Sequence, residues 1–132
     1  MQELNLTPTK NTPEVKFNSG RLEMHGEAFP ENASDFFRPL LDWLDNYKTS
    51  SYVREEGQGT VFVSNIDYFN TMSRPYVLEI VKKLNCMNQS GHPVRMKWFY
   101  EGELDIDEDD INFQELIDNF SIQIDYIPKT TR

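Results

Sequence analysis

The sequence predicts an α/β (α+β) fold in which a mixed β-sheet packs against helices, and three observations indicate it. Residues 14–26 alternate between apolar and polar side chains around a turn, which is typical of an antiparallel hairpin. After residue 32, segments with helical apolar spacing alternate with short apolar segments of strand length. The 132 residues suffice for one hydrophobic core and are too few for two ordinary domains. We therefore expect one domain spanning 1–132.

The N-terminal part is predicted to be extended and antiparallel. The first twelve residues contain Thr7-Pro8 and Thr12-Pro13, which favour an extended arm or an edge strand. Glu14 to Asn18 and Arg21 to Gly26 then form the hairpin around Asn18-Ser19-Gly20.

The first predicted helix covers Ala33 to Tyr47, where six apolar residues follow helical spacing: Phe36, Phe37, Leu40, Leu41, Leu44 and Tyr47. Asn32 or Ser34 can cap its N-terminus. Pro39 is expected to bend or restart the helix, because proline removes a backbone donor. The polar stretch 47–59 is interpreted as a surface loop.

Alternating strands and helices follow. Residues 60–66 predict a strand buried on both faces, and 94–100 predict a second strand. The helix between them shows apolar residues at i, i+3, i+4 and i+7, beginning at Val77. A last helix is expected over Asp110 to Asn119 and a closing strand over Ser121 to Tyr126. Crossovers of this length imply parallel pairing, and buried side chains are expected at Val61, Val63, Val77, Val81, Leu84, Met96 and Trp98.

The composition restricts the functional class. A net charge of −9, from 22 acidic and 13 basic residues, disfavours nucleic-acid binding, which needs clustered Lys and Arg, but permits basic protein partners. The single cysteine, Cys86, excludes an internal disulfide and is interpreted as a small core residue. The N-terminus lacks the pattern of a signal peptide, and no apolar segment is long enough to cross a bilayer. These features predict a cytoplasmic protein.

The junction between the first buried strand and the following helix contains two hydroxyl residues, Thr71 and Ser73. Either could cap the helix, and Pro75 suits its first turn. A phosphate at this point would meet unsatisfied N–H groups and the positive end of the helix dipole, with Arg74 nearby. The junction is therefore either a simple cap or a regulatory phosphorylation site.

No motif indicates an active site or a cofactor. The acidic run Glu101 to Asp110 resembles the start of a calcium loop, but Asp110 occupies the place of the required glycine and Leu116 that of the terminal glutamate. A solvated acidic loop is favoured over weak divalent binding or docking to a basic partner. His25 and His92 belong to no ligand-spaced cluster. We expect no catalytic residue, no metal and no cofactor.

Four separated blocks resemble the SiaC-type regulatory phosphoproteins, which are similar to anti-sigma factor antagonists: T-K-N-T-P-E-V at 9–15, G-E-A-F-P-E-N at 26–32, Y-F-N-T-M-S at 68–73 and V-R-M-K-W-F-Y-E at 94–101. The resemblance covers nearly the whole chain and implies a STAS-like fold. It differs at Met72, where the family more often has a small hydroxyl residue, and at Arg74-Pro75.

The resemblance implies a partner-switching function. The threonine of the Asn-Thr pair, Thr71 by position, would be phosphorylated by a cognate kinase and restored by a PP2C-like phosphatase. The unphosphorylated form would bind and activate a diguanylate cyclase, and so control cyclic di-GMP production. Residues expected to contact partners are Tyr68, Phe69, Asn70, Met72, Ser73, Arg74, Phe29, Glu31 and Asn32. For residues 29–32, the capping chemistry favours the alternative of a tight turn that caps a helix.

Two alternative functions remain at this point. One is a small acidic metal-dependent enzyme that uses the acidic run, with Asp105 and Asp107 as the residues to test. The other is a structural adaptor that is never modified and binds its partner whatever the state of Thr71.

Overall fold

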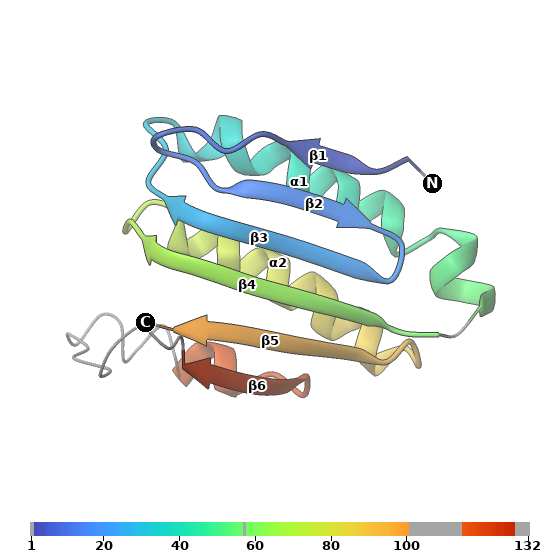
Figure 1. Cartoon of the computed structure of the whole chain (residues 1–132). Coiled ribbons are helices and arrows are strands. Elements are labelled where there is room, and N and C mark those ends of the chain that lie inside the picture. The colour runs from blue at the N-terminus through green and yellow to red at the C-terminus, as the bar shows by residue number, and fades with distance from the viewer. Residues whose placement is uncertain (1, 57, 101–114, 129–132) are drawn as a thin grey trace.

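The computed structural model describes residues 2–56, 58–100 and 115–128, and forms two layers (Figure 1). Six strands form one sheet in the order β1-β2-β3-β4-β5-β6. Strands β1 to β3 pair antiparallel, whereas β3 to β6 pair parallel. The elements are β1 (Leu4–Leu6), β2 (Glu14–Asn18), β3 (Arg21–Ala28), α1 (Ala33–Tyr47), η1 (Tyr52–Glu56), β4 (Thr60–Phe69), α2 (Arg74–Gln89), β5 (Val94–Tyr100) and β6 (Gln123–Pro128).

Both long helices cover the same face of the sheet (Figure 1). The sequential strand order explains this arrangement, because successive crossovers that progress in one direction with one handedness leave their helices on one side. The opposite face has no helix over it in the described part of the chain. The predicted mixed sheet, hairpin and packed helices are confirmed, and the N-terminal arm forms the edge strand β1.

The core lies between the sheet and the two helices. Strand side chains on the helical face are fully buried, among them Phe17, Leu22, Phe62 and Met96. They meet a buried stripe of each helix: Phe37, Leu40, Leu44 and Tyr47 from α1, and Val77, Ile80, Val81 and Leu84 from α2. Six of the seven side chains expected in the core are buried, and Val61 is half-buried.

Helix α1 has the predicted bounds and one predicted cap. The Asn32 side-chain oxygen accepts a hydrogen bond from the Asp35 N–H at 3.1 Å. The expected restart at Pro39 is wrong, because α1 runs through this residue. Pro39 is exposed, so water can reach the Asp35 carbonyl that loses its donor. The Lys83 ammonium contacts the Asp45 carboxylate at 2.6 Å and joins α2 to α1, which lowers the pKa of Asp45.

Several expectations need correction. Residues 47–59 are not a plain surface loop, because 52–56 form one π-helical turn and Tyr52 stacks on the buried Tyr47. Strand β4 extends to Phe69, three residues beyond the predicted end, and pairs with β3 across a bulge at Gly26/Glu27. It is only partly buried on the side without helices, where Val63 is buried but Val61 and Asn65 are half-buried.

The remaining differences concern Cys86 and the C-terminal part. Cys86 is exposed, because the helix turns this position away from the stripe that faces the sheet. Of the predicted last helix, 115–118 are helical, and the part before residue 115 lies outside the described residues. The closing strand β6 begins two residues later than predicted and pairs parallel with β5.

Candidate partner-binding and phosphorylation site

The turn between β4 and α2 is held by Asn70. Its side-chain oxygen accepts hydrogen bonds from the Ser73 N–H at 3.0 Å and from the Ser73 hydroxyl at 2.5 Å. Its own N–H donates to the Ala28 carbonyl at 2.9 Å, which fastens the turn to the end of β3. The turn 70–73 is therefore preformed before any partner binds.

Thr71 and Met72 lie at the tip of this turn and face solvent. The exposed fraction of Met72 is 67%, the largest of any large apolar residue in the described chain. No hydrogen bond of the Thr71 hydroxyl is found within the described residues, so the predicted capping role does not apply to it. The hydroxyl is available for modification, and it lies next to an exposed apolar side chain.

Ser73, one of the expected partner contacts, is fully buried, so its side chain is not on the surface of the turn. It occupies the position before α2, yet its hydroxyl makes no cap to the helix; it donates to Asn70 and, at 3.5 Å, to the Ala28 carbonyl. The Ser73 backbone is already helical, with φ −81° and ψ −26°, so its hydroxyl is not in the geometry of an N-cap. Ser73 holds the turn in shape.

The loop after β3 lies beside this turn, as the shared Ala28 carbonyl requires. Both loops are at the carboxyl ends of neighbouring parallel strands, at the left edge of the sheet in Figure 1. Glu31 and Asn32 are exposed and Phe29 is half-buried. The helix-capping interpretation of residues 29–32 is correct for Asn32, while Glu31 remains available to a partner.

A third loop, which is not among the expected contact segments, joins the same edge. The Phe29 N–H donates to the Asn11 carbonyl at 2.9 Å. Within this loop the Thr9 and Thr12 hydroxyls are 2.6 Å apart, and the Thr9 hydroxyl accepts from the Asn11 and Thr12 N–H groups. The block 9–15 carried part of the family resemblance, which was the available signal. We name the combined surface of residues 9–12, 29–32 and 70–72 the switch edge.

Three other residues were expected to contact partners: Phe69, Arg74 and Tyr68. Phe69 is half-buried, with its ring centroid 6.0 Å from that of Trp98. Arg74 is half-buried at the first position of α2. The side chain of Tyr68 lies outside the described part of the structure.

No metal-binding cluster is found within the described residues. They contain no group of three or more His, Cys, Asp or Glu side chains that could hold a metal ion. The acidic run 101–110, with Asp105 and Asp107, lies outside them. His25 on the open face contacts Glu23 at 2.9 Å and Asn65 at 2.9 Å. The hydrogen bond from His25 lowers the pKa of Glu23. Within the described ranges, no helix has the length and apolar character to cross a bilayer.

One family model matches nearly the whole chain. The model described as "SiaC family regulatory phosphoprotein" matches residues 6–127. An uncharacterized protein of Pseudomonas aeruginosa (strain UCBPP-PA14) is 29% identical over 104 residues, which cover 76% of this chain and 78% of that protein.

Solved structures of SiaC from Pseudomonas aeruginosa share the fold at 23% sequence identity. One structure of SiaC superposes with a TM-score of 0.80, covering 98% of this chain and 100% of that one. SiaC in complex with the diguanylate cyclase SiaD, of which it is described as the activator, gives a TM-score of 0.77 with 96% and 99% coverage.

Proposed function

This chain belongs to the SiaC family of regulatory phosphoproteins, and on that premise we propose that it is a non-enzymatic switch whose partner binding depends on phosphorylation of Thr71. The unmodified form binds and activates a diguanylate cyclase, and so raises cyclic di-GMP production. A cognate kinase adds the phosphate and a PP2C-like phosphatase removes it. Cys86 needs no oxidising compartment, which is compatible with a cytoplasmic location.

The observation that carries the proposal is the exposed Thr71 on a turn that other residues hold. Asn70 and Ser73 make the hydrogen bonds that shape the turn, and Thr71 makes none within the described chain. Losing the Thr71 hydroxyl or adding a phosphate to it therefore leaves these hydrogen bonds intact. Modification can change the surface without unfolding the domain.

The switch-off step is electrostatic and local. Phosphate adds about −1.5 to −2 charges beside Met72. Met72 is 67% exposed, so burial of this side chain by a partner would stabilise the complex more than burial of any other large apolar side chain of the described chain. A partner pocket that accepts this apolar side chain would have to desolvate the neighbouring phosphate as well, which is unfavourable. Phosphorylation therefore releases the cyclase.

The same geometry implies competition. A kinase must enclose Thr71, and the cyclase must cover Met72, the next residue. Both proteins therefore need the switch edge, and one chain cannot hold both. The relative SiaC forms a complex with its cyclase SiaD, which supports a cyclase as the effector class here.

Intact-mass measurement after co-expression with the cognate kinase tests the site. We expect one phosphate on the native chain and on Thr49→Ala, a control at an exposed threonine elsewhere on the surface. We expect none on Thr71→Ala. Full phosphate incorporation in Thr71→Ala would reject this residue as the switch. A Thr71→Glu variant that binds the cyclase as well as the native chain does would favour an unmodified adaptor instead, if phosphorylation also left binding unchanged.

A further inference from the structure

The loop before β2 and the turn after β4 lie on the two sides of the end of β3, at the switch edge (Figure 1). One peptide unit, between Ala28 and Phe29, connects them. Its carbonyl accepts the Asn70 N–H at 2.9 Å, and its N–H donates to the Asn11 carbonyl at 2.9 Å. The carbonyl and N–H of a trans peptide point in opposite directions, so Asn11 and Asn70 flank this peptide. Because neighbouring strands are about 4.8 Å apart, the two flanking backbones are about 10 Å apart.

The loop 9–12 is held closed by its first residue. The Thr9 hydroxyl oxygen accepts from the N–H groups of Asn11 and Thr12 at 3.2 and 3.0 Å. The Thr9 N–H donates to the Thr12 carbonyl at 3.0 Å. Lys10 therefore lies at the tip of a preformed turn. Lys10 is exposed, and its ammonium group has no ion pair in the part of the chain that the structure describes.

Thr71 lies at the corresponding tip on the other side of β3 and is also exposed. Among the residues of the switch edge, Lys10 is the only cationic one and Glu31 the only anionic one. The four-carbon stem of a lysine and a phosphate on a threonine each reach about half of the 10 Å that separates the two backbones. The ammonium and the phosphate can therefore meet across the end of β3 while both turns keep their hydrogen bonds.

The start of α2 offers a phosphate less than the sequence suggests. The Ser73 N–H already donates to a side chain of the turn, and Pro75 has no N–H. The Tyr76 N–H donates to the Ser73 carbonyl at 3.1 Å. Arg74 is half-buried and is already engaged in an interaction. The lysine of the loop 9–12 is therefore the available cation.

We propose that Lys10 binds the phosphate of Thr71 within the same chain, an inference that rests on the proposed phosphorylation of Thr71. Phosphorylation then does more than add charge, because it lays the lysine side chain across the end of β3 beside the half-buried Phe29. This contact closes part of the surface that the unmodified chain offers to a partner. On a chain of net charge −9, the lysine also reduces the repulsion that the additional negative charge creates.

Phosphorus nuclear magnetic resonance on the full chain tests the proposal. Phosphothreonine is encoded genetically at position 71, so the test does not depend on a kinase. A nearby ammonium group favours the doubly ionised phosphate and lowers the midpoint of its pH titration. We expect the midpoint to lie about 0.2–0.7 pH units lower with Lys10 in place than in Lys10→Gln, the range that an exposed ion pair produces.

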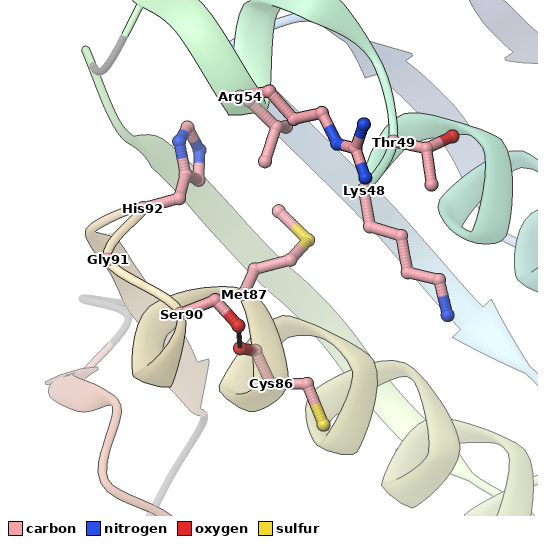
Figure 2. A pocket seen from close by; sticks show the side chains of 9 residues that line it. Lys48, Thr49, Arg54, Cys86, Met87, Ser90, Gly91 and His92 are labelled. Atoms are coloured by element: carbon pink, nitrogen blue, oxygen red, sulfur yellow. Dashed lines mark hydrogen bonds between the residues drawn. The ribbon is translucent and has the colours of Figure 1, made fainter.

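Three controls separate a specific contact from a general charge effect. Lys10→Arg keeps the cation and should keep the low midpoint. Lys48→Gln removes the same charge at the other end of α1 (Figure 2) and should leave the midpoint unchanged. Sodium chloride at about 1 M should reduce the difference between the Lys10 chain and Lys10→Gln, because salt screens exposed charges.

Equal midpoints with and without Lys10 would overturn the proposal, and so would an equal rise in Lys10→Gln and Lys48→Gln. Failure of the proposed function gives a different result. If phosphorylation left cyclase affinity unchanged, Thr71 would not be the switch. The midpoint comparison would still decide whether Lys10 binds the encoded phosphate.

Discussion

The two edges of the sheet use hydrogen bonds in opposite ways. At the switch edge, Asn70 and Ser73 bond to each other and to the Ala28 carbonyl, and the residues between them, Thr71 and Met72, point outward. At the other edge, Tyr47 and Thr60 are buried inside the domain and their hydrogen-bond chain ends at the buried His92.

This difference shows which edge a partner can contact and which edge supports the fold. A projecting turn whose own polar groups are satisfied presents a hydroxyl and an apolar side chain, which another protein can enclose. A chain of buried polar side chains presents nothing that a partner can contact, and it supports the fold instead. Substitutions at the switch edge should therefore change binding more than stability, and those in the buried chain should change stability more than binding.

The largest effect on stability is expected at Tyr47. Tyr47→Ala removes a fully buried ring that stacks on Trp43 and should lower the free energy of unfolding by about 3–5 kcal/mol. Tyr47→Phe keeps the ring but leaves the Gly20 N–H without its acceptor and removes the hydrogen bond to the Thr60 hydroxyl, at a cost of about 1–3 kcal/mol. Urea denaturation measures both. A neutral Tyr47→Phe would show that the buried chain does not support the fold.

Asn70→Ala should change both properties. It removes the oxygen that accepts from the Ser73 N–H and hydroxyl, which should cost about 0.5–2 kcal/mol, and it should weaken cyclase binding because the turn loses its shape. Asn70→Asp keeps the acceptor and should retain stability. If Asn70→Ala lowers stability while cyclase affinity, measured by calorimetry, stays unchanged, partners do not depend on the preformed turn.

Met72→Ser should affect binding alone. The side chain is mostly in solvent, so the free energy of unfolding should change by less than about 0.5 kcal/mol. Cyclase affinity should fall about tenfold or more, as for the loss of a central apolar contact. Leu116→Ser is the matched control, because Leu116 is 50% exposed and lies outside the three segments of the switch edge. Equal losses in the two variants would remove the special role of Met72.

The smallest effect is the pH dependence due to His92. Its pKa is lowered from 6.5 by burial, so the unfolded chain binds a proton that the folded chain does not. Stability should be complete above about pH 7 and should fall as the pH drops below 6.5. The carboxyl groups of Glu23 and Asp45, with pKa values lowered from 4.5 and 3.8, act only at lower pH. In His92→Gln, the slope of unfolding free energy between about pH 7 and 5.5 should flatten; an unchanged slope would contradict the assignment.

The elements that the sequence predicted well are those with strong apolar periodicity. The bounds of α1 and the buried stripe of α2 follow from the helical spacing of apolar residues such as Leu40, Leu44, Val81 and Leu84. These side chains are buried, and their spacing needs no knowledge of distant contacts. Polar segments were harder to predict. The turn 52–56 forms because Tyr52 stacks on Tyr47 and donates to the Gly59 carbonyl, and these contacts depend on the assembled fold.

The candidate site follows the same rule: its local features could be predicted from the sequence, and its contacts between distant segments could not. Thr71 lies where the junction of strand and helix indicated, but the role of Ser73 depends on a carbonyl 45 residues away in the sequence, at Ala28. The Asn11 contact to Phe29 and the buried chain from Gly20 to His92 likewise join distant segments. No local spacing rule could reveal these contacts, although the family blocks did include residues 9–15 and 26–32.

The central claim is that phosphate on Thr71 controls effector binding, and one titration tests it most directly. The cognate diguanylate cyclase is titrated with the unmodified chain and with the same chain phosphorylated to completion, as verified by intact mass. We predict measurable binding of the unmodified chain, at least about tenfold weaker binding of the phosphorylated chain, and native affinity for Thr71→Ala after the same kinase treatment. Equal affinity of the unmodified and phosphorylated chains would contradict the account.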